Sequence, residues 1–233
     1  MKSLRPSQLE TAREIVRHRH AAAYATLVIE GAYEEAGEAG RFKVSPGDVL
    51  LHAPFSIHRD IVSNRRTVVL DLPLPFDGRD WTARSRIADP DAILALAERD
   101  ASEARSAMLD AITPSNDIET DLPDLLARDL GQDASLAVGE WAETQGVSRE
   151  TAWRHFRGAY GVDIAAYRSE ARARKAWRMI MASDASLASI AAAAGFSDQP
   201  HMSRAVKALT GATPGAWRRK PATSVQDGGV SAS

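Results

Sequence analysis

The sequence has no cysteine among its 233 residues, which excludes disulfide bonds, thiolate metal ligands and thiol nucleophiles. It also has no apolar run approaching the roughly 18 residues that a membrane-spanning helix needs. The stretch from Met1 to Arg5 lacks the apolar core of a signal peptide. We therefore expect a cytoplasmic protein without a membrane partner.

Net charge is also small, at −2, but it is unevenly distributed. Residues 1–130 contain 16 lysines and arginines against 22 aspartates and glutamates, a difference of −6, whereas residues 131–233 contain 13 against 9, a difference of +4. A polyanion such as nucleic acid requires a basic excess in its partner. The second half of the chain is therefore the candidate for nucleic-acid binding.

Two helix-turn-helix patterns follow one another within residues 137–219. In the first, residues 146–148 form the turn, and the Ser148 hydroxyl is suited to accept a free backbone N–H of the next helix. Three positions recur at helical spacing and predict the buried face of that helix: Ala152, Phe156 and Tyr160. Three charged side chains are left on its outer face: Glu150, Arg154 and Arg157.

The second pattern has Gly195 in its turn and either Ser197 or Asp198 as the cap of the following helix. Pro200 falls in the first helical turn, where a missing N–H costs least. The predicted inward positions are Met202, Val206 and Leu209. The predicted outward positions are Gln199, His201, Arg204 and Lys207.

Between the two patterns, residues 164–182 contain neither proline nor glycine and predict one connecting helix. Its predicted apolar side carries Tyr167, Ala171, Ala176 and Met179, and its cations, spread around the other side, are Arg168, Arg172, Lys175 and Arg178. At about 1.5 Å per residue such a helix spans on the order of 30 Å. This is close to the roughly 34 Å between successive major-groove faces of a duplex. The spacing therefore favours two reading helices placed one turn of DNA apart.

This half of the sequence resembles the DNA-binding domain of AraC/XylS-type transcriptional regulators. The resemblance is carried by the first turn with Ser148 and Phe156, by Gly161, by the connecting helix with Arg172, Ala176 and Met179, by Ile190-Ala191, by Gly195-Phe196-Ser197-Asp198-Gln199, and by Gly211-Ala212-Thr213-Pro214 before Trp217-Arg218-Arg219. Met202 and Val206 stand where the family usually has aromatic residues, and Pro200 where it often has a polar one. These departures predict a different packing or tilt for the second reading helix.

The resemblance implies a set of DNA-contacting positions: Glu150, Trp153, Arg154, Arg157, Gln199, Pro200, His201, Ser203 and Arg204. Among them Arg154 and Arg204 are the favoured base readers, because a guanidinium can donate two hydrogen bonds to guanine O6 and N7. Gln199 suits adenine, and other cations hold phosphate and set the register. The alternative is that Arg154 and Arg157 only form a solvated helix face.

In the first half, short β-like segments alternate with turn residues and predict a small antiparallel barrel or sandwich. They are residues 24–29, 40–44, 48–52 and 67–72. The run from Val44 to Leu51, followed by Pro54 and His58, resembles the second motif of the cupin fold. The tripeptide from His18 to His20 resembles the start of the first motif.

The cupin resemblance implies a divalent ion held by histidines and a glutamate, but no glutamate stands near Tyr24, at the expected distance after His20. We therefore assign no metal and no cofactor. The candidate effector pocket comprises His18, His20, Tyr24 and His58. Two alternatives stay open for the histidines: a metal bound by His18, His20 and His58, or ordinary hydrogen bonding in a region that also contains His52.

The predicted architecture is α+β with two domains. A cupin-like β-barrel in residues 1–88 serves sensing or dimerisation, and an all-α domain in residues 132–220 has two helix-turn-helix units joined by a linker helix. Residues 89–131 form a helical linker, with an amphipathic helix at 89–111, a loop at 113–117 and a short helix at 122–130. In the family such an amphipathic helix packs on the cupin and can mediate dimerisation. Residues 221–233 are expected to be disordered.

The resemblance implies a sequence-specific regulator of transcription, an activator or a repressor, that binds double-stranded DNA under the control of a small ligand in the barrel. RNA polymerase and a second copy of the chain are further candidate partners. The alternative is an effector-blind DNA-binding protein that uses the cupin only for oligomerisation. We expect no enzyme, because no Ser-His-Asp or paired-carboxylate spacing is present in the sequence.

Overall fold

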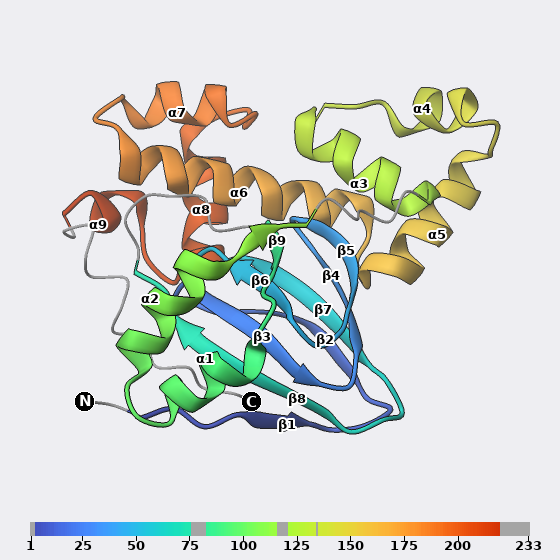
Figure 1. Cartoon of the computed structure of the whole chain (residues 1–233). Coiled ribbons are helices and arrows are strands. Elements are labelled where there is room, and N and C mark those ends of the chain that lie inside the picture. The colour runs from blue at the N-terminus through green and yellow to red at the C-terminus, as the bar shows by residue number, and fades with distance from the viewer. Residues whose placement is uncertain (1–2, 76–82, 116–120, 134, 220–233) are drawn as a thin grey trace. The chain divides into compact units, whose positions relative to one another are not determined.

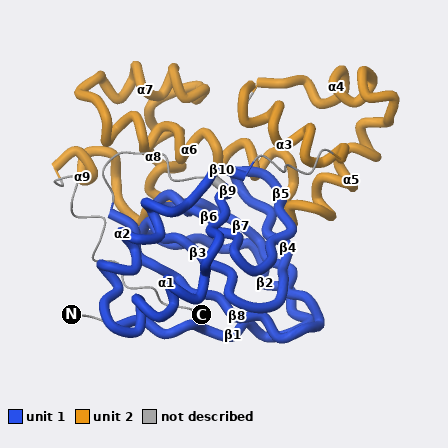
Figure 2. Tube along the Cα trace, viewed as in Figure 1, with its two compact units in different colours: residues 1–118, 225–233 blue, residues 119–224 orange. Residues whose placement is uncertain are grey.

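The computed structural model describes residues 3–75, 83–115, 121–133 and 135–219, and it divides into two compact units (Figure 2). Residues 1–118 belong to unit 1, and residues 119–224 belong to unit 2. The predicted disordered tail, residues 221–233, lies outside the described residues. None of the described helices is both long enough and apolar enough to cross a lipid bilayer.

Unit 1 consists of two antiparallel sheets and two helices (Figure 1). The six-stranded sheet has the order β1-β8-β3-β6-β9-β10, with bounds Ser7–Leu9, Thr67–Pro73, Tyr24–Glu30, Asp48–His52, Ala83–Arg86 and Thr113–Pro114. The four-stranded sheet has the order β2-β7-β4-β5, with bounds Glu14–Arg19, Ile57–Val62, Tyr33–Gly37 and Gly40–Val44. The cupin-like barrel predicted from the sequence is therefore built as two separate sheets.

The six-stranded sheet is covered on both faces, which explains why β3 is buried along most of its length. Successive side chains of a strand point to opposite faces. Ala25 and Leu27 therefore pack on the helical side, in a core with residues of α1 (Pro90–Ala97) and α2 (Ala101–Ala111). Val28 packs on the other side, in a core with Leu50 and Val69 of its own sheet and with four residues of the four-stranded sheet: Tyr33, Phe42, Val44 and Val62.

The predicted amphipathic helix at residues 89–111 is two helices, α1 and α2. Asp100 begins the second one, because its carboxylate accepts hydrogen bonds from the N–H groups of Ser102 and Glu103. Their apolar residues Ile93, Ala97, Ala104 and Met108 are buried against the six-stranded sheet. Much of the apolar face through which this amphipathic helix could mediate dimerisation is thus part of the core of unit 1.

The predicted loop at 113–117 contains β10, which pairs with β9, and its residues 116 and 117 lie outside the described residues. The predicted short helix at 122–130 is α3, Leu122–Gln132, and it belongs to unit 2. There the Tyr160 hydroxyl donates to Asp124 at 2.9 Å, and the Trp141 indole donates to Asp129 at 2.9 Å. Residues 89–131, grouped as one linker in the sequence, are therefore shared between the two units.

The described residues of unit 2 form helices joined by turns and loops. After α3 come α4 (Val138–Thr144), α5 (Arg149–Tyr160), α6 (Ile164–Ala182), α7 (Leu187–Ala193), α8 (Gln199–Thr210) and α9 (Pro214–Arg219). The helix α6 packs against partners at both of its ends. Near its start, Tyr167 contacts the rings of Phe156 and Tyr160 at 5.1 and 5.6 Å between centroids, and near its end Trp177 contacts Trp217 at 5.8 Å.

The sequence pattern described α6 incompletely. Tyr167 and Ala176 are buried as predicted, but Arg174 and Trp177 are almost fully buried too. Three of the cations expected on an outer face are half-buried and not exposed: Arg168, Arg172 and Arg178. Because neighbouring helices pack on more than one side of α6, its cationic stripe is not a simple solvated face.

Candidate functional site

The first helix-turn-helix unit consists of α4, the turn at residues 145–148 and α5. Gly146 has a φ of 69°, a left-handed conformation that glycine adopts without a steric penalty. The Ser148 hydroxyl accepts the N–H of Thr151 at 3.1 Å, as predicted for the cap of α5. The predicted inward residues Ala152, Phe156 and Tyr160 are all buried. This packing fixes which face of α5 is turned outward.

The second unit, α7-turn-α8, is built in the same way. Gly195 has a φ of 80°, and of the two predicted caps it is Asp198 whose carboxylate accepts the N–H of His201, at 2.7 Å. Pro200 lies in the first turn of α8. The predicted inward residues Met202, Val206 and Leu209 are buried. The aliphatic residues at these positions thus form an ordinary helix core.

Eight of the nine predicted DNA-contacting residues are exposed, and Ser203 is half-buried. The exposed ones are Glu150, Trp153, Arg154 and Arg157 on α5, and Gln199, Pro200, His201 and Arg204 on α8. Trp153 is 40 % exposed although it is large and aromatic, and the Arg157 guanidinium lies 5.2 Å from the centre of its ring. The two helices therefore present arginine, amide and aromatic groups together on their outer faces.

Two contacts place the second turn within unit 2. Arg172 of α6 donates to the Gly195 carbonyl at 3.3 Å, so a residue of the connecting helix holds the turn that precedes α8. The Phe196 ring packs edge-on against His201, with 5.1 Å between centroids. Arg172 is one of the residues that carry the family resemblance, but the sequence assigned it no role. The contact of Arg172 with the turn depends on tertiary packing, which no local pattern reveals.

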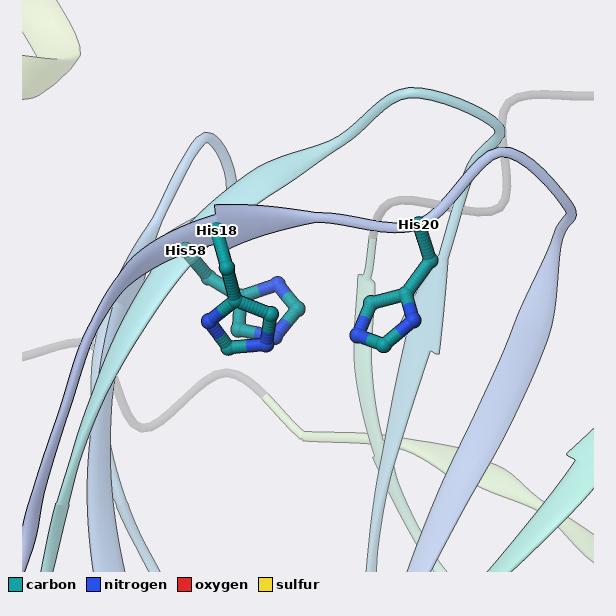
Figure 3. A group of neighbouring side chains, drawn as sticks. All are labelled: His18, His20 and His58. Carbon is teal, nitrogen blue, oxygen red and sulfur yellow. The ribbon is translucent and has the colours of Figure 1, made fainter. Parts of the chain in front are cut away.

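Unit 1 brings the predicted pocket residues together. His18 lies on β2, opposite His58 of β7, and His20 follows the end of β2. The three imidazoles project to the same side of these strands (Figure 3). Their ring centroids are 4.3 Å apart for His18 and His58, and 5.1 Å apart for His18 and His20. Tyr24 stands 4.7 Å from the His20 ring, and its hydroxyl lies 3.4 Å from His58 Nε2.

Each of the three imidazoles can offer one nitrogen to a common centre, since the ligand atoms all lie within 4.8 Å of one another. The Nδ1 of His18 lies 3.1 Å from the Val16 carbonyl, so the tautomer that donates this hydrogen bond leaves Nε2 with a free lone pair. These residues fit the histidine part of the metal set that the cupin resemblance implies. They do not supply its carboxylate, because Tyr24 occupies that region.

Burial keeps these imidazoles neutral. It lowers the pKa of His20 to about 4, with a further contribution from the nearby His18. It also lowers the pKa of His52 to about 3 and holds the pKa of His58 well below its ordinary value. A neutral imidazole is the form that binds a metal ion or accepts a hydrogen bond.

Sequence reasoning did not identify Glu35 as part of this interior. It noted His52 only as another histidine of the same region. His52 of β6 stacks on Tyr24 with 4.3 Å between ring centroids, and Glu35 of β4 places its carboxylate 3.7 Å from His52 Nδ1. Glu35, His52 and His58 are all buried and form a second group whose ligand atoms lie within 4.8 Å of one another. The local signal for Glu35 was weak, because it precedes the Gly37-Glu38-Ala39-Gly40 turn in a charged hairpin.

Residues 141–220 match the family model described as a helix-turn-helix domain. The transcriptional activator NphR of a Rhodococcus species is 32 % identical over 90 residues, which cover 39 % of this chain and 27 % of that protein. The match thus spans about a quarter of the length of this relative.

Solved structures with a related description include a transcriptional regulator from Chromobacterium violaceum with an AraC-type DNA-binding domain. It is 30 % identical, covering 36 % of this chain and 74 % of that one, with a TM-score of 0.34. ToxT of Vibrio cholerae O395 is 9 % identical, covering 97 % of this chain and 98 % of that one, with a TM-score of 0.44.

Together with the geometry of unit 2, the family match identifies this part of the chain as a helix-turn-helix domain. Its two units match, in their turns, caps and buried helix faces, the pattern on which the resemblance to AraC/XylS-type regulators rests.

Proposed function

We propose that the protein is a sequence-specific DNA-binding regulator of transcription in which α5 and α8 read successive major-groove faces. The observation that carries this proposal is the pairing of two capped helices, each with an exposed arginine-bearing face, within a unit built around the single 19-residue helix α6. The basic excess of residues 131–233 supports it, since phosphate attraction provides the sequence-independent part of binding.

Within this proposal, Arg154 and Arg204 read bases and Gln199 contacts adenine, because their side chains are exposed on the two reading helices. Trp153 and Arg157 act as a stacked pair that lies against the sugar-phosphate backbone. His201 has a different position, because the Ser197 hydroxyl lies 3.4 Å from its Nδ1 and the Phe196 ring packs on it. It therefore contributes mainly by fixing the start of α8.

The test is selection of bound sequences from a randomised duplex pool at two salt concentrations, using the full chain. We expect recovered sites with two short boxes about one helical turn apart, and a loss of retention at higher salt for all sequences. Retention without any sequence preference would contradict base reading and leave only shape- and charge-driven binding.

We further propose that unit 1 controls this DNA binding through a ligand held between its two sheets. The support is the polar end of the space between the sheets, where His52, His58 and Glu35 are buried. The cavity beside these residues has a volume of about 10 Å³, whereas pockets for organic ligands measure roughly 300–1,000 Å³. The ligand is therefore of the size of a single ion or water molecule.

The effector-blind alternative has its own support in the apolar end of the same space, where Val28, Phe42 and Leu50 are packed together. A scaffold that only brings copies of the chain together needs such a core and no ligand. RNA polymerase and a second copy of the chain are the further partners that we propose. Measuring DNA affinity with and without added divalent metal separates the two readings, because an effector-blind protein binds its site equally in both.

A further inference from the structure

Glu35, His52 and His58 meet because three strands from the two sheets bring inward-facing side chains to one end of the interior. In the four-stranded sheet, Glu35 of β4 pairs with Asp60 of β7, two residues beyond His58 on the same face. In the six-stranded sheet, His52 of β6 pairs with Tyr24 of β3. The three residues are 7 %, 4 % and 4 % exposed.

Two imidazole nitrogens in this group are buried without a hydrogen bond. His52 Nε2 and His58 Nδ1 have no hydrogen-bond partner among the described residues. The same is true of the neighbouring Ser56 Oγ and Asp60 Oδ1. Buried polar atoms are normally paired, so the unpaired His58 Nδ1, Ser56 Oγ and Asp60 Oδ1 point to an occupant that would satisfy them.

The space for that occupant is small. The cavity of about 10 Å³ is lined by Glu35, His52, Ser56 and His58 among others, and about 10–15 Å³ is needed for one water molecule. The Glu35 Oε1 and His52 Nδ1 atoms are 3.7 Å apart, too far for a hydrogen bond. Two ligands at about 2.1 Å from a tetrahedral ion are separated by about 3.4 Å, which is close to this spacing.

The arrangement of groups at this end of the interior also suits a cation. Buried carboxyl oxygens of Glu35 and Asp60 lie 3.7 Å from His52 Nδ1 and 3.9 Å from His58 Nε2. A divalent ion would stabilise the ionised carboxylates and use imidazole lone pairs at the same time.

We propose that unit 1 binds a divalent transition-metal ion, with Zn²⁺ as the representative species, through Glu35, His52 and His58. Two imidazoles and one carboxylate form a ligand set for such ions and leave a coordination position open. This set differs from the one that the cupin resemblance implies, because its carboxylate comes from β4 and its second imidazole from β6. The proposal concerns metal binding alone and stands independently of DNA recognition.

The test is equilibrium dialysis of the metal-free full chain against Zn²⁺, with bound metal measured by mass spectrometry. We expect one ion per chain in the wild type. In Glu35→Gln and His52→Gln the affinity should fall by more than the roughly 10- to 100-fold that the loss of an outer-shell partner costs. His18→Gln and His20→Gln should retain the ion, and the exposed His155→Gln serves as the matched control.

Unchanged Zn²⁺ affinity in Glu35→Gln and His52→Gln, or no binding by the wild type, overturns the proposal. Loss of the ion in His18→Gln and His20→Gln alone would place it on the other histidine group and overturn it equally. Because a buried substitution can prevent folding, a second measurement uses the wild type only. With Co²⁺ in place of Zn²⁺, paramagnetic shifts should be largest for the ring protons of His52 and His58, and largest shifts at His18 and His20 would contradict the site.

Discussion

At the scale of single residues, the outer faces of α5 and α8 differ in what holds their side chains. Arg157 is stacked on Trp153, and His201 is held by its own turn. Arg204, by contrast, is exposed on α8, one helical turn beyond Pro200. An extended guanidinium at this position can reach the edge of a base, so Arg204 is the side chain at which base reading is tested most directly.

Replacing Arg204 with alanine should weaken binding to the selected site by about 1–3 kcal/mol and relax the preference at one position of one box. Binding to random duplexes should change less, because only one positive charge is removed. Fluorescence anisotropy with both kinds of duplex measures this difference. Arg99→Ala, which removes an exposed arginine from unit 1, is the control. An equal loss on both duplexes would show that Arg204 contacts phosphate.

The cap of α8 predicts a pH dependence. The hydrogen bond from the His201 N–H, together with the hydroxyl of Ser197, lowers the pKa of Asp198 below its ordinary value of 3.8. A carboxyl with a depressed pKa contributes stability above its unfolded pKa and loses it as pH falls through the folded one. The His201 amide resonance should therefore titrate with a midpoint below 3.8 in an NMR pH series. In Asp198→Asn, which keeps the cap without the charge, this titration should disappear.

At the scale of helices and strands, local signals were reliable where the chain itself decides the structure. The turns at Gly146 and Gly195 and the buried faces of α5 and α8 follow from capping and helical periodicity, and they are confirmed. The strand β2 was missed because its sequence Glu-Ile-Val-Arg-His-Arg is mostly polar, and only pairing with β7 makes it a strand. The strand β10 has only two residues and exists through its pairing with β9.

The histidine interior shows the same limit. Two short motifs indicated His18, His20 and His58, and the structure brings these residues together. Glu35 and His52 joined the group through the registers of β4 with β7 and of β3 with β6. The two residues then meet because the two sheets face each other. The cupin motif places its glutamate shortly after His20, and it therefore gives no sign of a carboxylate on another strand.

The cap of α5 gives a prediction at this scale. Ser148→Ala removes the acceptor for the Thr151 N–H and should lower the free energy of unfolding of unit 2 by about 1 kcal/mol. Chemical denaturation monitored by tryptophan fluorescence measures it, because Trp141 and Trp177 are buried in this unit. Ser148→Asn can still cap the helix and should retain nearly all of the stability. Equal losses in the two variants would show that the hydroxyl has no capping role.

At the scale of the whole molecule, the chain consists of two units with separate cores, a sheet core in residues 1–118 and a helical core in residues 119–224. An ion bound in unit 1 should stabilise the folded form of that unit by mass action. The two units therefore offer an internal comparison for any ligand.

Calorimetry of the full chain should show two unfolding transitions, and Zn²⁺ should raise the midpoint of only one of them. At a free concentration of about 100 times the dissociation constant, the stabilisation should be about 2.7 kcal/mol. In Glu35→Gln this transition should no longer respond to Zn²⁺. A shift of only the transition that Ser148→Ala lowers would contradict an ion bound in unit 1.

The two reading helices share α6, and this has a consequence for how the domain folds. The first half of α6 completes the core around Phe156 and Tyr160, and its second half completes the core around Trp217. One continuous helix, α6, belongs to both cores. Unfolding of either core therefore frays the helix on which the other core depends. Unit 2 therefore folds cooperatively, and it cannot be divided into two independent reading modules by cutting between them.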